Sequence, residues 1–430
     1  MSSNLSKTTI SERVTNISKD DKERASPSVF GGASIVACIC VGAGMLALPT
    51  SGAGGWTVWS TLLLCIAMLA MSASGCCILE VLQTYKIRIS IASITKDLLG
   101  SKVAVITNLS VYFVGGTLLY AYTTSSGLII QEFTRLDHQW ASILFVAICS
   151  LFVWYSPLLV SRISVLLIIF VFVSFIIILS GLLPEIQVHN LFNTNTNVSE
   201  KAFYSLFLFP IALASFGYHH SVSTLRDIYQ SEHKAQSAII LGTAIALVMY
   251  VLWLVAVFGN MPRQSFQYVV SHGGDVDILL SVLSQYIHSD TKDIISSFTA
   301  AAILSSFIGV GMGVFDYIAD LFSFDNSKIG RGKTLAVTFL PPLFLSLLVP
   351  HGFLSALSVA ASAAAFWTCI IPTLLVFKVR DKRARSLQQT DYKVRGGNWT
   401  LMGILFFGLG SIFIHVLSFT SLLPIFGVSS

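Results

Sequence analysis

The chain has 430 residues, of which 54% are hydrophobic and 11% are charged, and its formal net charge is +5. About a quarter of the residues of a soluble globular protein are charged, so this composition excludes a soluble protein and predicts an all-α polytopic membrane protein. The basic residues are scattered among short polar segments instead of gathering on one face, which argues against a nucleic-acid partner.

Residues 1–28 are polar and rich in Ser and Lys, without the apolar stretch of a signal peptide, and we expect a disordered cytoplasmic tail there. Eleven apolar segments follow, which we interpret as transmembrane helices. Their approximate limits are 29–53, 57–82, 103–131, 140–156, 158–183, 202–224, 236–259, 293–322, 334–349, 352–377 and 399–424.

Charge supports this count. With the N-terminus in the cytoplasm, 22 of the 26 Lys and Arg residues fall in segments that are inside and 4 in segments that are outside, as the positive-inside rule requires. The C-terminus is then outside, where 425–430 form a short tail. The longest outside connection runs from 260 to 291, and its apolar residues between Asp275 and His288 have helical spacing, which predicts an amphipathic cap.

The first apolar segment contains residues that break helices. Gly42, Ala43, Gly44 and Met45 stand in its middle, and Pro49 follows. Backbone that is freed at membrane depth must face protein or a wet cavity, so a break here predicts a binding site near the bilayer midplane. The alternative is that the glycines only let neighbouring helices pack closely.

The sixth segment is interrupted in a comparable way, at Ser215, Phe216, Gly217 and Tyr218. Many transporters are inverted repeats with broken helices in matching positions. Five segments per repeat give the two repeats opposite topology. We therefore expect a first repeat at 29–183, a second at 202–378, and an eleventh helix at 396–424 outside the symmetry. The predicted architecture is eleven transmembrane helices in a five-plus-five inverted repeat with helices 1 and 6 broken.

Two such breaks suit a zwitterion. The N-terminus of a half-helix offers N–H groups and partial positive charge to a carboxylate, and unwound carbonyls accept hydrogen bonds from an ammonium group. Side chains near the breaks would select the substrate, among them Tyr120 in the third segment.

Titratable side chains inside the segments are candidates for ion coupling. Asp316 is the deepest carboxylate in any segment, and an intramembrane acid is a functional candidate by default. His219 and His220 follow the second break, and histidine titrates near neutral pH. The structural alternatives are a buried pair for Asp316 and hydrogen bonds to exposed backbone for the histidines. Glu80 lies near the end of a segment, and we interpret it as an interfacial anchor.

Several stretches carry a family resemblance. They are Val41–Pro49, Ser215–His219, Gly259–Arg263, Gly311–Asp320, Pro350–Phe353 and Tyr392–Gly397. In this order they resemble motifs of the aromatic and hydroxy amino acid permeases, and most of all the bacterial tyrosine and tryptophan permease branch of the amino acid–polyamine–organocation superfamily. The resemblance implies a transporter of the bacterial inner membrane that imports an aromatic amino acid, tyrosine first and tryptophan second, by proton symport with alternating access.

Other functions stay open. Serine or threonine as substrate, sodium as the coupling ion, and an amino acid sensor that does not transport are the alternatives. An enzyme is not expected, because the chain has no H-E-x-x-H or G-x-S-x-G motif. A channel would more often show a filter loop. The seven cysteines show no metal-ligand spacing, so we expect free thiols, no metal and no cofactor. No obligate protein partner is evident.

Overall fold

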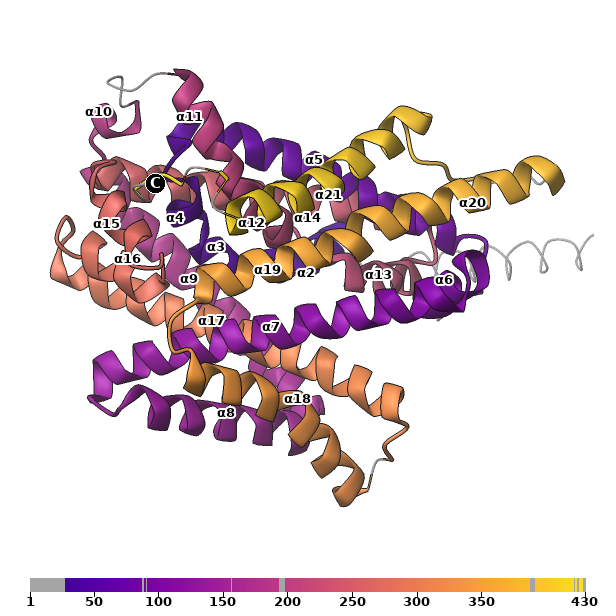
Figure 1. The fold of residues 1–430 in the computed structure, drawn as a ribbon, viewed down its shortest axis with the longest axis horizontal. Helices are drawn as coiled ribbons and strands as arrows, with labels where there is room; N and C mark the ends of the chain where they lie inside the picture. The colour runs from indigo at the N-terminus through magenta and orange to yellow at the C-terminus, as the bar shows by residue number, and fades with distance from the viewer. Residues whose placement is uncertain are drawn as a thin grey trace, which may run out of the picture.

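The computed structural model describes residues 28–430 except 87, 88, 90, 156, 193–197, 326, 387–390, 421, 424 and 428–430. The tail predicted at 1–28 lies outside the described residues apart from Ser28, and so does half of the segment 425–430. Throughout the described part every regular element is helical, and Figure 1 shows most of the long helices running side by side in one bundle. The prediction of an all-α protein is confirmed.

A helix is present at each of the eleven predicted positions. The long helices are α5 (Trp56–Leu82), α7 (Ser101–Thr134), α8 (His138–Tyr155), α9 (Pro157–Leu182), α14 (Glu232–Asn260), α17 (Ser289–Phe322), α18 (Lys328–Leu348) and α21 (Gly397–Phe419). The interrupted ones are α2 (Val29–Cys40) with α3 (Ala43–Leu46) and α4 (Leu48–Gly52), α12 (Leu208–Ser215) with α13 (Val222–Tyr229), and α19 (Phe353–Ala365) with α20 (Ile371–Ser386).

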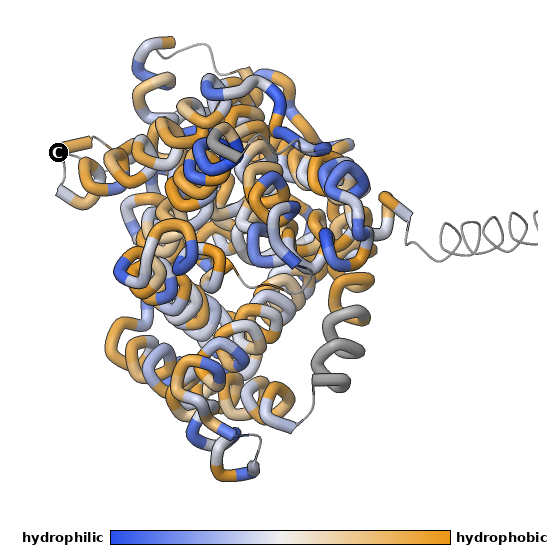
Figure 2. The backbone as a smooth tube through the Cα atoms, turned by 90° about the vertical axis from the view of Figure 1, so that its right-hand side faces the viewer, coloured by the Kyte–Doolittle hydropathy of each residue, from blue (hydrophilic) through white to orange (hydrophobic). Residues whose placement is uncertain are grey.

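Among the described residues, nine helices are long and apolar enough to cross a membrane, and up to ten if the bent pair at the start of the chain forms one span. The remaining position is occupied by α18, which contains Pro341 and Pro342 and does not reach that hydropathy. The exact count of eleven spans and the inverted repeat therefore stay predictions. Figure 2 shows hydrophobic residues along most of the helices, and many large apolar side chains are exposed on their outer faces, as lipid contact requires.

Small residues let the helices approach closely. A Cβ atom added to Gly242 of α14 would lie 2.6 Å from the Cβ of Val36 on α2. The start of α2 is also tied to α13, because the Tyr229 hydroxyl donates to the Ser28 carbonyl at 2.7 Å and accepts from the Gly32 N–H at 3.0 Å. Close packing of this kind stabilises the association of helices inside a membrane, where the hydrophobic effect does not drive them together.

One end of the bundle carries the short helices α15 (Ser265–Ser271) and α16 (Val276–Leu283), and we call it the cap side. The helix expected within Asp275–His288 is confirmed as α16, which buries its apolar face. Asp275 is buried and accepts a hydrogen bond from the Phe353 N–H at 2.8 Å, at the start of α19. Burial, followed by the nearby charge of Asp277, raises the pKa of Asp275 above its ordinary 3.8. Arg263 donates to the carbonyls of Ala53 and Gly54, just after α4.

The opposite end carries α6 (Ile91–Leu99), α13 and α20 with their basic residues, and we call it the basic side. Glu80 near the end of α5 is fully buried there, not an interfacial anchor. Arg380 of α20 donates to both of its carboxylate oxygens, at 2.7 and 2.8 Å, and the Val394 N–H adds a third bond at 2.8 Å. This network holds α5, α20 and the segment before α21 together.

Candidate functional site

The first helix breaks where the sequence predicts. α2 ends at Cys40 and α3 begins at Ala43, and the two halves of the span are bent by 57°. Between them the backbone of Gly42 is extended, with φ −138° and ψ −151°. Ala43 and Gly44 open α3, so their N–H groups have no acceptor within the helix, as at any helix start. Backbone donors and carbonyls are thus both available in mid-span.

The sixth helix is interrupted as well, without a sharp bend. α12 ends at Ser215, and the turn η3 (His219–Ser221) follows before α13. In between, the N–H groups of Phe216 and Gly217 bond the carbonyls of Leu213 and Ala214, and Tyr218 bonds back to Phe216. The long hydrogen-bond ladder is therefore lost over Phe216, Gly217 and Tyr218, and the prediction of a second break is confirmed.

The two breaks lie against each other. The Ser215 Oγ is 3.4 Å from the Gly44 carbonyl oxygen, and a Cβ on Gly44 would lie 3.5 Å from the Ser215 Cα. On the other side of the first break, a Cβ on Gly42 would lie 2.6 Å from the Oγ of Ser306 in α17. A side chain at position 42 would have to displace the Ser306 hydroxyl, so this close approach favours glycine there. The glycines therefore allow close packing in addition to the break, and the alternative that they serve close packing only is wrong.

A tyrosine from a third helix joins the breaks. The Tyr250 hydroxyl of α14 lies 2.6 Å from the Cys40 carbonyl, the last residue of α2, and 2.6 Å from the Ser215 carbonyl, the last residue of α12. A hydroxyl has one proton, so it satisfies one of these carbonyls at a time. The Cys40 carbonyl also accepts from the Gly42 N–H at 2.9 Å, which leaves the Tyr250 proton for the Ser215 carbonyl. The C-terminal ends of two half-helices, with their partial negative charge, thus meet at this hydroxyl.

The aromatic residues of the second break are packed inside the protein. Phe216 is fully buried and meets the Tyr250 ring edge to face, with 5.2 Å between the ring centroids. Tyr218 is also fully buried, donates to the Met71 carbonyl of α5 at 3.0 Å, and lies against Gly75. In this conformation both rings position the break against its neighbours.

The two histidines differ in surroundings. His219 is fully buried, and neither of its ring nitrogens has a hydrogen-bond partner among the described residues. His220 is exposed. The imidazole of His219 stacks on Tyr218 at 4.9 Å and meets the edge of Trp367 at 6.2 Å. Trp367 belongs to η4 (Phe366–Ile370), a π-helical turn of the kind that often marks functional positions.

Asp316 lies on an exposed face of α17. Its side chain and that of Asp320 one turn further are exposed, and a Cβ on Gly309 or Gly313 of the same face would meet no atom within 4 Å. The neighbouring Phe315 is buried under the guanidinium of Arg331, which bonds the last carbonyls of α8. The structure therefore does not bring Asp316 into contact with the two breaks.

Two further residues proposed for the site, Tyr120 and Met45, differ in position: Met45 belongs to α3 at the first break, and its N–H bonds the Gly42 carbonyl at 3.0 Å. The Tyr120 hydroxyl donates to the Val349 carbonyl at 3.1 Å, in the connection between α18 and α19. Met45 is fully buried in the core. Tyr250 and Ser306, which do contact the breaks, were not singled out from sequence. A lone tyrosine in the middle of an apolar span is the signal that identifies Tyr250.

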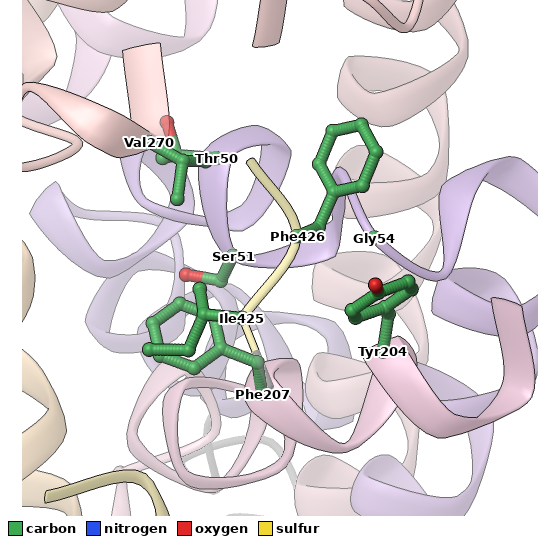
Figure 3. A pocket seen from close by; sticks show the side chains of 8 residues that line it. All are labelled: Thr50, Ser51, Gly54, Tyr204, Phe207, Val270, Ile425 and Phe426. Atoms are coloured by element: carbon green, nitrogen blue, oxygen red, sulfur yellow. The ribbon is translucent and has the colours of Figure 1, made fainter. Parts of the chain in front are cut away.

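A pocket elsewhere on the cap side is separate from this site. Figure 3 shows Ser51, Phe207 and Ile425 close together, with Tyr204 and Phe426 beside them. Phe426 also packs under the Arg263 guanidinium, 4.1 Å from its ring centroid. The pocket lies at the ends of α4 and η2 (Ser205–Phe207), beyond the breaks.

Solved structures share this architecture. The crystal structure of the Eremococcus coleocola manganese transporter in complex with an aromatic bis-isothiourea substituted compound matches with a TM-score of 0.59 and 13% identity, over 92% of this chain and 88% of that chain. Identity at this level shows the fold alone. Fold and facing breaks together define a polytopic membrane protein with the broken-helix transporter fold.

Sequence comparison is more specific. The tryptophan-specific transport protein of Haemophilus influenzae is 42% identical over 91% of this chain and 96% of its own length, and the low affinity tryptophan permease of Escherichia coli 35% over 95% and 100%. The tyrosine permease of Enterobacter agglomerans is 32% identical over 84% and 89%. The model of the tryptophan/tyrosine permease family matches residues 25–415, and the chain belongs to that family. It is an aromatic amino acid permease and not an enzyme.

Proposed function

We propose that the protein imports an aromatic amino acid with a proton across the bacterial inner membrane by alternating access. The observation that carries this proposal is the meeting of the two breaks at Tyr250. The N–H groups of Ala43 and Gly44 at the start of α3 suit the substrate carboxylate, and the carbonyls of Cys40 and Ser215, each of which has two lone pairs, suit its ammonium group. Met45, Phe216, Gly217, Tyr218 and Tyr120 complete the proposed substrate-binding set.

Tryptophan and tyrosine are the two substrates of this proposal. The tryptophan transport relatives described above share 42% and 35% identity with this chain, and the tyrosine permease shares 32%. Serine, threonine and sodium, and a sensor that does not transport, are the outcomes that the experiment below separates.

Asp316, His219 and His220 are the proposed proton-coupling residues, and Asp316 comes first among them. A carboxylate that faces lipid is costly, so the glycine-rich face of α17 that carries Asp316 fits a water-filled path better than a lipid surface. One proton that moves down a potential of 100 mV releases about 2.3 kcal/mol, which supports roughly fiftyfold accumulation of substrate. In the membrane orientation that we propose, the N-terminus is cytoplasmic and the cap side is periplasmic.

The test is uptake of radiolabelled tryptophan into proteoliposomes that contain the purified protein, under an imposed pH gradient and separately under a sodium gradient. We expect accumulation with the pH gradient alone and competition by tyrosine more than by serine or threonine. Asp316→Asn should abolish accumulation while exchange of labelled for unlabelled substrate continues. The matched control is Asp320→Asn, one turn away on the same exposed face, which should keep accumulation.

Other outcomes overturn parts of the proposal. Accumulation only with sodium would reject the proton and its three residues. Competition by serine but not by tyrosine would reject the aromatic substrate. Binding of tryptophan without uptake under either gradient would make the protein a sensor.

A further inference from the structure

Two polar groups beside the second break have no hydrogen-bond partner. Both ring nitrogens of His219 and the Nε1 of Trp367 are buried without one among the described residues. Other buried atoms among the described residues share this property, including Nε1 of Trp253, whose ring packs on Phe298 of α17. His219 and Trp367 differ because their rings meet each other, nearly perpendicular at 85°. They form one cluster.

An unpartnered polar group inside a membrane protein is unfavourable. Neutral imidazole has one acceptor nitrogen and one N–H donor, and the indole Nε1 is only a donor. The cluster therefore offers an acceptor and a donor side by side. It stands directly after the Phe216–Tyr218 break on one side and in the π-helical turn of the tenth helix position on the other.

From this geometry we infer that His219 and Trp367 form hydrogen bonds with the polar atoms at the edge of the substrate's aromatic ring. His219 accepts a hydrogen bond from the indole N–H of tryptophan or the phenol O–H of tyrosine. Trp367 donates to the phenol oxygen of tyrosine, for which the indole of tryptophan has no equivalent acceptor. Phenylalanine satisfies neither group. The inference rests on the proposed transport of aromatic amino acids and assigns its specificity to these two side chains.

Such a site discriminates strongly, because a substrate that lacks the polar group leaves the protein's own buried group unpaired. The same argument predicts different effects for the loss of each residue. Loss of the His219 acceptor weakens both tryptophan and tyrosine. Loss of the Trp367 donor weakens tyrosine alone.

The test measures competition against labelled tryptophan uptake by tyrosine, phenylalanine and benzothienylalanine, a tryptophan analogue with sulfur in place of the indole N–H. In the wild type we expect benzothienylalanine and phenylalanine to compete at least about tenfold more weakly than unlabelled tryptophan. This comparison needs no variant, and the sulfur analogue adds no methyl group that would clash. Equal competition by benzothienylalanine and tryptophan would overturn the inference.

Variants then assign the roles. They are measured by exchange of labelled for unlabelled tryptophan, which continues without proton coupling. His219→Phe should bring tryptophan and benzothienylalanine to within about twofold of each other, and Trp367→Phe should weaken tyrosine about fivefold relative to tryptophan. The matched control is His233→Phe, an exposed histidine near the start of α14 that belongs to none of the proposed sites, which should keep the wild-type ranking of competitors. An unchanged ranking in His219→Phe would refute the acceptor role.

Failure of this inference differs from failure of the proposed function. If the wild type takes up no tryptophan under any gradient, the proposed transport is wrong. If it takes up tryptophan and benzothienylalanine competes as well as tryptophan does, only the proposed recognition of the ring's polar atoms by His219 and Trp367 is wrong.

Discussion

The buried ion pair on the basic side gives the sharpest stability prediction. Glu80 is fully buried, and Arg380 and Val394 together donate three hydrogen bonds of 2.7–2.8 Å to its carboxylate. Glu80→Gln removes the negative charge and leaves the guanidinium uncompensated. Breaking one partner of a buried pair is destabilising by about 3–5 kcal/mol.

The magnitude converts to a measurable melting temperature. At about 2.1 cal/mol/K per residue, the unfolding entropy of a chain of this length is about 0.9 kcal/mol/K, so the loss corresponds to roughly 3–5 °C. The assay is size-exclusion chromatography with tryptophan fluorescence after heating of the detergent-solubilised protein. The double variant Glu80→Gln/Arg380→Gln should recover part of the loss, because the stranded charge is gone.

A second ion pair on the same side serves as the control. Lys382 and Asp97 are 3.9 Å apart and largely exposed, with side-chain exposures of 72% and 55%. Exposed pairs contribute about 0–1 kcal/mol, so Asp97→Asn should lower the melting temperature by about 1 °C or less. The reasoning is refuted if Glu80→Gln melts within 1 °C of the wild type, or if Asp97→Asn melts as low as Glu80→Gln.

Three further predictions concern the site and the cap. Gly42→Ala should reduce tryptophan uptake at least about tenfold. Ser306→Ala should partly rescue that variant, because it removes the atom that the new methyl group meets. The control Gly116→Ala, where a Cβ meets nothing within 4 Å, should transport normally. Tyr250→Phe should raise the KM for tryptophan about tenfold while the melting temperature changes little, and an unchanged KM would remove Tyr250 from the site. Because burial raises the pKa of Asp275 above 3.8, its stabilising effect is largest below that pH and is lost as pH rises through the folded pKa. Asp275→Asn should therefore lessen the fall in melting temperature between pH 4 and pH 7, and an equal fall in both proteins would contradict this.

Much of the fold is legible in the sequence, because hydropathy and length locate helices that must cross lipid. Gly42 and Gly44 in mid-span, and Gly217 among polar residues, likewise predict both breaks. These signals are local: each lies within a few residues of the feature that it predicts.

Features that depend on distant contacts were not predictable. Tyr250 reaches a carbonyl 210 residues earlier, and Glu80 pairs with an arginine 300 residues later. Position near the end of a span suggested an interfacial anchor for Glu80, because nothing nearby in the sequence reveals the partner that makes its burial tolerable. The roles of Asp316, His219 and His220 also depend on which of them water reaches, which the spacing of residues does not encode.

The attachment of α2 to α13 through Tyr229 has a mechanical consequence. The 57° bend gives the first helix a hinge, and the lost hydrogen bonds give the sixth helix another. The half-helices beyond these hinges on the basic side are joined by the Tyr229 hydroxyl, which donates one hydrogen bond and accepts another. The half-helices α2 and α13 therefore form one rigid unit that can rotate about the two breaks. We expect them to move together, so the basic side would open in one cooperative event. Probes on either half-helix should then report a single relaxation rate.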